Sequence, residues 1–172
     1  ITVDPNPGSV DRTATVTIGG SVHTITQRGS GAALRELWAM GDDTDGQLVS
    51  NRLRNRTTPI ATASNVRLAA TGDFHSFFLK TDGTLWAAGL NLSGQLGDGT
   101  TLTRTTPVQV ASGVRAAAAG SSHSLFLKSD GTLWAMGSNR EGQLGDGSTS
   151  TRLNPVQVAS GVNLAVFHSW GI

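Results

Sequence analysis

The sequence predicts an all-β fold, and two observations carry that prediction. The first is a fixed period: Trp86 and Trp134 are 48 residues apart, as are His75 and His123, and Trp38 lies another 48 residues upstream. The second is composition, because 22 glycines and many Thr, Ser and Val residues are typical of short strands joined by turns. A period of this length indicates a repeat architecture.

Length and charge exclude several classes of protein. The chain has 172 residues, and 13 basic against 12 acidic residues give a formal net charge of +1. This balance argues against a nucleic-acid partner, because such proteins usually carry a strong basic surface. No apolar run is long enough to span a membrane, and the absence of cysteine excludes disulfides, thiolate metal sites and a cysteine nucleophile. Since Ile1 rather than Met stands first, we expect the chain to come from a longer or processed protein.

The first predicted element is a β-hairpin near the N-terminus. Residues 13–18 and 21–27 alternate with a period of two, and Gly19-Gly20 stands between them. Two glycines suit the primed turn that joins hairpin strands, because both central residues of that turn adopt positive φ. An isolated hairpin is only marginally stable in water, so this one is expected to need a partner sheet.

The N-terminal stretch ITVDPNPGSVDRTATVTIGGSVHTITQRG, residues 1–29, resembles the last strands of a BACON domain. Such domains are immunoglobulin-like modules of exported bacterial proteins. The resemblance implies a secreted or cell-surface location in a bacterium and makes carbohydrate a candidate ligand, but most of the module is absent and no sugar-binding residue is transferred. The alternative is a hairpin that only covers an exposed sheet edge. Residues 30–36 are predicted to be a linker and residues 37–172 to hold the repeats.

Each repeat is predicted to contribute four short strands. In the last full copy these are Pro107–Val110, Val114–Ala119, Ser124–Lys128 and Thr132–Met136. The alanines of the second strand favour a helix by propensity, but the flanking glycines leave too few residues for one. Four short strands in about 50 residues are typical of one propeller blade. Residues 37–172 therefore predict an incomplete β-propeller of about 2.5 blades, preceded by the hairpin.

The segment HSLFLKSDGTLWAMGSNREGQLGDGS, residues 123–148, resembles a regulator of chromosome condensation repeat. The shared pattern is G-x-x-H-S, then D-G, then L-W-x-x-G-x-N-x-x-G-Q-L-G, and it runs over residues 72–97 and again over residues 120–145. The resemblance implies a propeller, usually with seven blades, that serves as an interaction surface. Roles in the family include nucleotide exchange on a small GTPase, ubiquitin ligation, light reception and β-lactamase inhibition.

Two copies depart from this pattern. In the first, Leu34–Glu36 stands where D-G-T is expected, and Asp42–Gly46 and Val49-Ser50 replace the usual loop residues. The last copy is shortened at Val162–His168. Seven blades would need about 350 residues, so this chain alone is not expected to close a ring. It is a fragment of a longer array, an open arc, or a subunit that closes with copies of itself.

The histidines that recur with the repeat are interpreted as structural. His75, His123 and His168 each precede a serine. A ring of imidazoles would suit a metal or an acid–base site, but a catalytic group is needed once rather than once per blade. We therefore expect each ring to bond backbone groups inside its blade, and we assign no catalytic residue.

The remaining candidates for chemistry are also interpreted as structural. Trp38, Trp86 and Trp134 are predicted to pack in the core or between blades, with a sugar-stacking platform as the alternative. Asp43-x-Asp45 resembles the start of a calcium loop, but the further oxygen ligands and the distal glutamate are missing. The sequence therefore predicts no metal and no cofactor.

The positions at which the two good copies differ are the candidate contact surface. They fall in predicted loops, and where a scaffold repeats while its loops vary, the loops are candidates for binding. The alternative is that these positions are simply free to vary. The predicted contact residues are Leu90, Leu92, Ser93, Leu102, Ser138, Arg140, Glu141 and Ser150.

These observations predict a non-enzymatic binding module that presents variable loops to a protein partner. One alternative is a structural arc that closes into a ring by self-association. Another is a carbohydrate-binding accessory module of an exported bacterial protein. An exchange activity on a small GTPase follows from the family resemblance alone, because one fold serves many functions.

Overall fold

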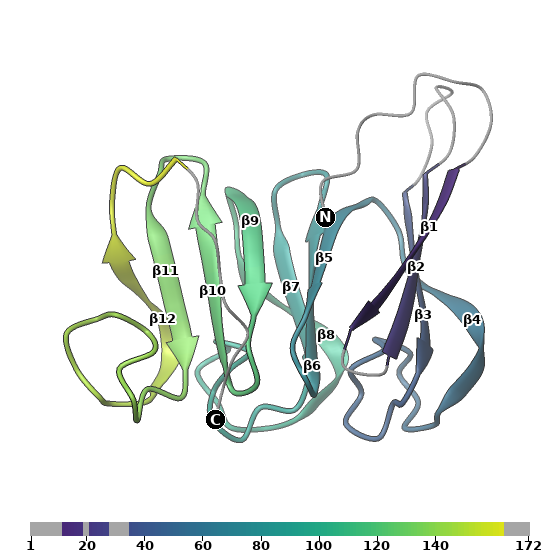
Figure 1. The fold of residues 1–172 in the computed structure, drawn as a ribbon, viewed down its shortest axis with the longest axis horizontal. Coiled ribbons are helices and arrows are strands. Elements are labelled where there is room, and N and C mark those ends of the chain that lie inside the picture. The colour runs from purple at the N-terminus through teal and green to yellow at the C-terminus, as the bar shows by residue number, and fades with distance from the viewer. Residues whose placement is uncertain (1–11, 19–20, 28–34, 164–172) are drawn as a thin grey trace.

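The computed structural model describes residues 12–18, 21–27 and 35–163, which form three sheets of four antiparallel strands and no helix. The sheets stand side by side (Figure 1), in the strand orders β1-β2-β3-β4, β5-β6-β7-β8 and β12-β11-β10-β9. The all-β, incomplete-propeller prediction is therefore confirmed. The strands are β1 Arg12–Ile18, β2 Ser21–Gln27, β3 Glu36–Gly41, β4 Arg56–Ala63, β5 Val66–Thr71, β6 His75–Lys80, β7 Leu85–Gly89, β8 Arg104–Ala111, β9 Val114–Ala119, β10 His123–Lys128, β11 Leu133–Gly137 and β12 Arg152–Ala159.

The N-terminal hairpin is part of the first sheet. Strands β1 and β2 pair with Ile18 opposite Ser21, as the predicted two-residue connection requires. Strand β2 also pairs with β3, with Ile25 opposite Leu37. The hairpin thus meets its expected need for a partner sheet, and it takes the two places that β5 and β6 take in the second sheet. The predicted Gly19-Gly20 turn lies outside the described residues.

The strand predictions within the repeats are confirmed. The alanine-rich segment is β9, a strand rather than a helix, and β10 and β11 lie within one residue of the predicted bounds. In the described ranges no helix has the length and apolar character that crossing a membrane requires. The shortened last copy lies, from residue 164 onward, outside the described residues.

The predicted grouping of strands into sheets was wrong by one strand. Pro107–Val110, counted first in its repeat, belongs to the longer strand β8, which pairs with β7 and completes the preceding sheet. The third sheet instead begins with β9 and ends with β12. A sequence period fixes the length of the repeating unit, whereas strand pairing decides where each sheet begins. Each sequence repeat therefore bridges two sheets.

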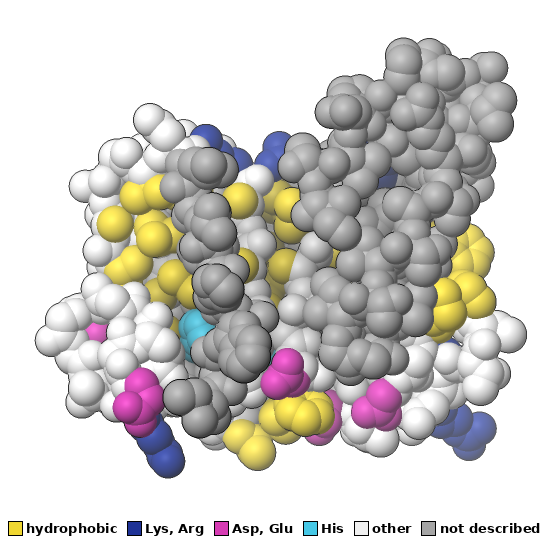
Figure 2. Space-filling view, in the orientation of Figure 1, with side chains coloured by type: hydrophobic (Ala, Val, Ile, Leu, Met, Phe, Trp, Pro, Cys, Tyr) yellow, Lys and Arg dark blue, Asp and Glu magenta, His cyan; other side chains and the backbone are white. Residues whose placement is uncertain are grey.

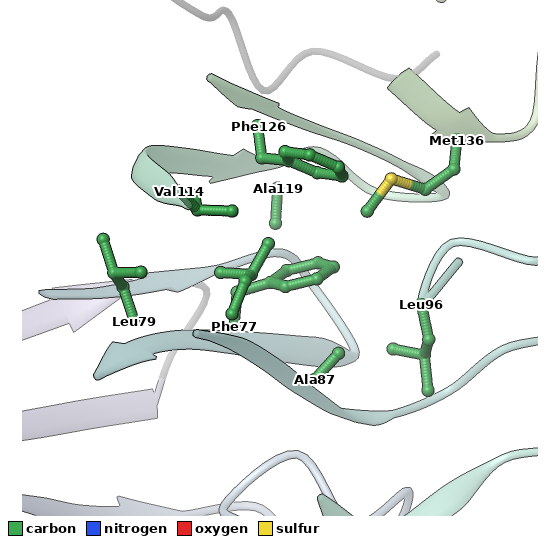
Figure 3. Close-up of a cluster of buried hydrophobic side chains, with 9 residues drawn as sticks. Phe77, Leu79, Ala87, Leu96, Val114, Ala119, Phe126 and Met136 are labelled. Carbon is green, nitrogen blue, oxygen red and sulfur yellow. The ribbon is translucent and has the colours of Figure 1, made fainter. Parts of the chain in front are cut away.

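The core lies between sheets rather than inside one. Figure 3 shows Phe77 and Leu79 of the second sheet facing Val114, Phe126 and other side chains of the third. A smaller cluster joins the first sheet to the second in the same way. Because each sheet buries its faces against its neighbours, side-by-side packing supplies the apolar burial that a single four-stranded sheet lacks. The core residues of the smaller cluster are Leu37, Val49, Val66, Phe78 and Ala88.

Candidate functional site

The long loops of the three sheets emerge at one end of the molecule. Each connects the third strand of a sheet to the fourth, and all three lie at the lower edge of Figure 1. The short connections between the first two strands of the second and third sheets lie at the same end, because successive strands are antiparallel. We call this end the loop face, and it comprises residues 42–55, 72–74, 90–103, 120–122 and 138–151.

A buried asparagine holds the long loop of the second sheet in shape, and another does so in the third sheet. The Asn91 side chain is fully buried, and its Oδ1 accepts a hydrogen bond from Leu96 N at 2.9 Å. Its Nδ2 donates to Asp98 Oδ1 and to Thr100 O, both at 3.0 Å. Asn139 makes the equivalent bonds in the third sheet. One amide thus ties the start of the loop to its middle, and so the variable positions are carried on a fixed frame.

An ion pair closes the base of the same loops. Arg104 Nε lies 2.7 Å from Asp98 Oδ2, and Arg152 Nε lies 2.7 Å from Asp146 Oδ2. Burial alone would raise the pKa of Asp98, but hydrogen bonds from Thr100 and Arg104 outweigh it and hold that pKa below its ordinary value. Hydrogen bonds from Ser148 and then Arg152 lower the pKa of Asp146. These carboxylates are therefore already used by the hydrogen bonds and ion pairs that hold the loops.

The first loop keeps this frame with different residues. Asp43 is buried where the other loops have asparagine, and its carboxylate accepts hydrogen bonds from Leu48 N at 3.0 Å and from the Ser50 hydroxyl. Ser50 stands where the other loops have aspartate, so each loop holds one carboxylate in this network. Val49 and Asn51 adopt φ values of 62° and 55° at positions where the second loop has glycine. The departures seen in the sequence therefore change the bonding but preserve the loop.

The carboxylate of Asp43, considered above as the start of a calcium loop, is used by these hydrogen bonds. The neighbouring Asp45 contributes its backbone N, which donates to Gln47 Oε1 at 3.0 Å. Across the described ranges, no three His, Asp or Glu side chains are grouped so that they could hold a metal ion.

The predicted contact residues all lie on the loop face, but they are not equally accessible. Leu92 and Leu102 are 70% and 62% exposed. Leu90, Ser93 and Ser138 are half-buried, and each uses its backbone N–H within the frame: Leu90 bonds Phe74 O, Ser93 bonds Gln95 Oε1 and Ser138 bonds Ser122 O. The other exposed members are Arg140, Glu141 and Ser150.

Two accessible apolar residues of the loop face were missed from the sequence. Phe74 is 45% exposed and Leu53 is 56% exposed. Phe74 replaces Ser122 of the next copy, so a comparison extended upstream of the best-matched segment would have found it. Leu53 lies in the first copy, whose divergence hides such differences.

The repeated histidine His75 lies between the second and third sheets. His75 is fully buried, and its Nε2 lies 2.8 Å from the Ser124 hydroxyl of the next sheet, while its Nδ1 has no partner among the described residues. The expectation of backbone bonds inside one blade was therefore wrong for this ring, because the neighbouring sheet supplies the partner. Burial, together with His123, lowers the pKa of His75 to about 3. The ring is neutral and shielded from solvent; His168 lies outside the described residues.

Trp86 and Trp134 are covered by other side chains and do not form an open platform. The Trp86 ring stacks on Phe78 with centroids 6.4 Å apart, and Lys80 Nζ lies over it at 4.5 Å from its centroid. Trp134 repeats this arrangement in the third sheet. Both rings are half-buried and pack against the clusters that join neighbouring sheets, as the packing interpretation predicts.

Two family models, both described as the regulator of chromosome condensation (RCC1) repeat, match the chain. One matches residues 66–95 and 114–143, and the other matches residues 82–127 and 130–168. Together they reach from residue 66 to residue 168, which is more than half of the chain. The comparison with curated proteins found no match.

Several solved structures are similar to this chain. Prp20p from Saccharomyces cerevisiae, described with its binding properties to Gsp1p and histones, has a TM-score of 0.68 and 21% identity over 81% of this chain and 36% of that chain. Human WBSCR16 has a TM-score of 0.67 and 22% identity over 83% of this chain and 37% of that one. A complex of Kap60 with yeast RCC1 (Prp20) has a TM-score of 0.69 and 19% identity over 92% and 37%. These likenesses show the fold, and the chain spans little more than one third of each solved chain.

Proposed function

Because the chain belongs to the family of regulator of chromosome condensation (RCC1) repeats, we propose that it is a non-enzymatic binding module whose loop face contacts a protein partner. The observation that carries the proposal is the placement of apolar side chains. Within the described ranges the exposed large hydrophobic residues are Leu53, Phe74, Leu92 and Leu102, and all of them lie on the loop face. Apolar groups gathered at one end of a molecule are typical of an interaction surface.

The buried polar groups support a non-enzymatic role. The pair formed by His75 and Ser124 has the distance of a nucleophile and its base, but both residues are buried between sheets. A substrate would have to separate the sheets to reach the hydroxyl. One solved relative supports protein binding, since Prp20 is described with its binding to Gsp1p and histones in one structure and is bound to Kap60 in another.

A site-specific cross-linking experiment tests this proposal. The chain has no cysteine, so a Leu92→Cys variant carries a single thiol that accepts a photo-crosslinker. The matched control is Thr81→Cys, in the exposed turn between β6 and β7 at the opposite end. After irradiation in extract of the source cell, we expect discrete protein adducts from position 92 and not from position 81. Adducts from position 81 alone, or none from either, would contradict the proposal.

One observation favours the alternative of self-association. Phe77 and Leu85 of the second sheet are buried against the third, whereas Leu125 and Leu133, at the same places in the third sheet, are only half-buried. A further sheet from a second copy would cover them. Light scattering after size exclusion tests this: a monomeric mass at all concentrations would contradict it.

The exported bacterial origin and the carbohydrate ligand rest on the BACON resemblance, and the division into residues 1–29, 30–36 and 37–172 rests on that resemblance together with the start of the repeats. We propose the location and the division on these grounds alone. Fractionation of the source cell tests the location, because recovery of the protein with the cytosol would contradict it. Retention on immobilised polysaccharide tests the ligand, and a Trp86→Phe variant tests whether a tryptophan contributes.

A further inference from the structure

One apolar part of the loop face is a small patch on the second sheet. Phe74 O accepts a hydrogen bond from Leu90 N at 2.8 Å, which ties the turn before β6 to the start of the loop after β7. Phe74 and Leu92 project from these two segments with 45% and 70% of their surface exposed. We call Phe74, Leu90 and Leu92 the apolar patch.

One carboxylate lies next to Phe74 in the chain, and two more lie in the neighbouring loop of the first sheet. Asp73 is exposed and directly precedes Phe74. The Ser76 hydroxyl donates to Gln47 O at 2.7 Å, which brings the first loop beside the start of β6. The side chain of Gln47 in turn bonds Asp42 Oδ2 at 3.3 Å and the backbone N of Asp45 at 3.0 Å. This chain of contacts places Asp42 and Asp45 in the loop that lies beside the start of β6, the strand that Asp73 and Phe74 directly precede.

The charges nearest the patch are negative. Figure 2 shows apolar side chains at the lower edge with acidic groups beside them, and basic groups only further out on either side. Within the described ranges the ion pairs of the loop face are those of Asp98 and Asp146 with their arginines. Asp73 is exposed, and Asp42 accepts hydrogen bonds from uncharged groups of Thr44 and Gln47, so each can still pair with a cationic group of a partner.

We propose that the apolar patch binds a short protein segment in which apolar and basic side chains occur together. This inference rests on the proposed function and adds the chemistry of the partner. The apolar side chains of the segment would bury Phe74 and Leu92, while its lysines or arginines would pair with Asp42, Asp45 and Asp73. Burial supplies most of the affinity and the charges select the partner, because exposed ion pairs contribute little binding free energy but penalise like charges.

Three fluorescent synthetic peptides test the inference by anisotropy. One contains leucine and lysine, one leucine and glutamate, and one serine and lysine, all of equal length. We expect only the first to bind, with an affinity that falls as salt is added. Leu92→Ser should weaken that binding about tenfold or more. Asp73→Asn should weaken it about two- to fivefold at low salt, whereas Asp82→Asn, the same charge change in the turn at the opposite end, should leave it unchanged.

The other outcomes would overturn the inference. Equal or tighter binding of the leucine–glutamate peptide would show that the carboxylates do not select the partner, and equal binding of the serine–lysine peptide would show that the patch is not used. If no peptide bound while the cross-linker at position 92 still captured proteins, the partner chemistry would be wrong and the proposed function would stand. A dimer in light scattering that Leu92→Ser dissociates would identify a second copy as the occupant instead.

Discussion

Acidification from neutral pH should destabilise this fold through His75. The ring is fully buried, lies 2.8 Å from the Ser124 hydroxyl and has His123 as its nearby ionisable neighbour. A proton on this ring would place a cation in a buried position where, among the described residues, no carboxylate contacts it. The unfolded chain instead hydrates the charged ring freely. As pH falls, protons therefore bind the unfolded chain first, and the free energy of unfolding decreases.

The size of the effect follows from the two pKa values. The ordinary pKa of histidine is 6.5, and burial lowers that of His75 to about 3. Each pH unit between these values costs about 1.4 kcal/mol, so acidification to about pH 4.5 should remove about 2.7 kcal/mol of stability. Burial also lowers the pKa of His123, which adds a loss of the same sign. The carboxylates with lowered pKa, such as Asp98, lose their contribution only below their ordinary value of 3.8, outside this window.

Urea unfolding followed by tryptophan fluorescence measures this loss at about pH 7.5, 5.5 and 4.5. The comparison variant is His75→Gln, which retains a side chain that bonds Ser124 but cannot be protonated. Its own loss between the same pH values should be smaller than that of the wild type by about 2 to 3 kcal/mol. An equal loss in both proteins, or a wild-type loss under about 1 kcal/mol, would refute the idea that a buried neutral imidazole governs the pH dependence.

Three further predictions concern the frame and the core, and urea unfolding measures each. Gly137→Ala should cost at least about 2 kcal/mol more than Gly142→Ala, because a Cβ at Gly137 would lie 2.5 Å from Ser122 O, whereas one at Gly142 meets nothing within 4 Å; equal costs would contradict the crowding. Asn91→Asp should destabilise the protein, because it places a second carboxylate against Asp98. Adding Asp98→Ser should recover about 1 to 3 kcal/mol, since the first loop has the same pair in Asp43 and Ser50. Strictly additive effects of the two substitutions would contradict this coupling. Phe126→Ala should cost about 3 to 5 kcal/mol, because this ring is buried between sheets; a cost under about 1 kcal/mol would exclude a tightly packed inter-sheet core.

Local signals were enough to predict the strands. The glycines around the alanine-rich segment limited its length, and alternation marked the hairpin, so Val114–Ala119 and Ser21–Gln27 were placed correctly. The grouping into sheets depends on which strands pair across the chain. Local patterns carry no such information, which is why Pro107–Val110 was assigned to the wrong sheet and the pairing of the hairpin with an exposed sheet edge, seen between β2 and β3, was expected only as an alternative.

The site was predictable only in part. Comparison of the copies identified Leu92 and Leu102, because exposed loop positions vary while the frame does not. Phe74 was not identified because the comparison of the two repeat copies began downstream of this residue. In the first copy, Asp43 replaces asparagine and Ser50 replaces aspartate, which looked like loss of the repeat pattern in the sequence. The two changes compensate each other through a hydrogen bond between residues seven positions apart, which the sequence does not reveal.

The offset between sequence repeats and sheets affects how such a chain can lengthen. Each 48-residue period contains the same four strand positions whatever residue is chosen as its start. A tandem duplication of one period therefore adds four strands, enough for one complete sheet, wherever its breakpoints fall. A breakpoint inside a strand joins the first part of that strand to the second part of the equivalent strand in the next repeat. Recombination within the gene can extend the array without aligning its breakpoints to the boundaries of the fold.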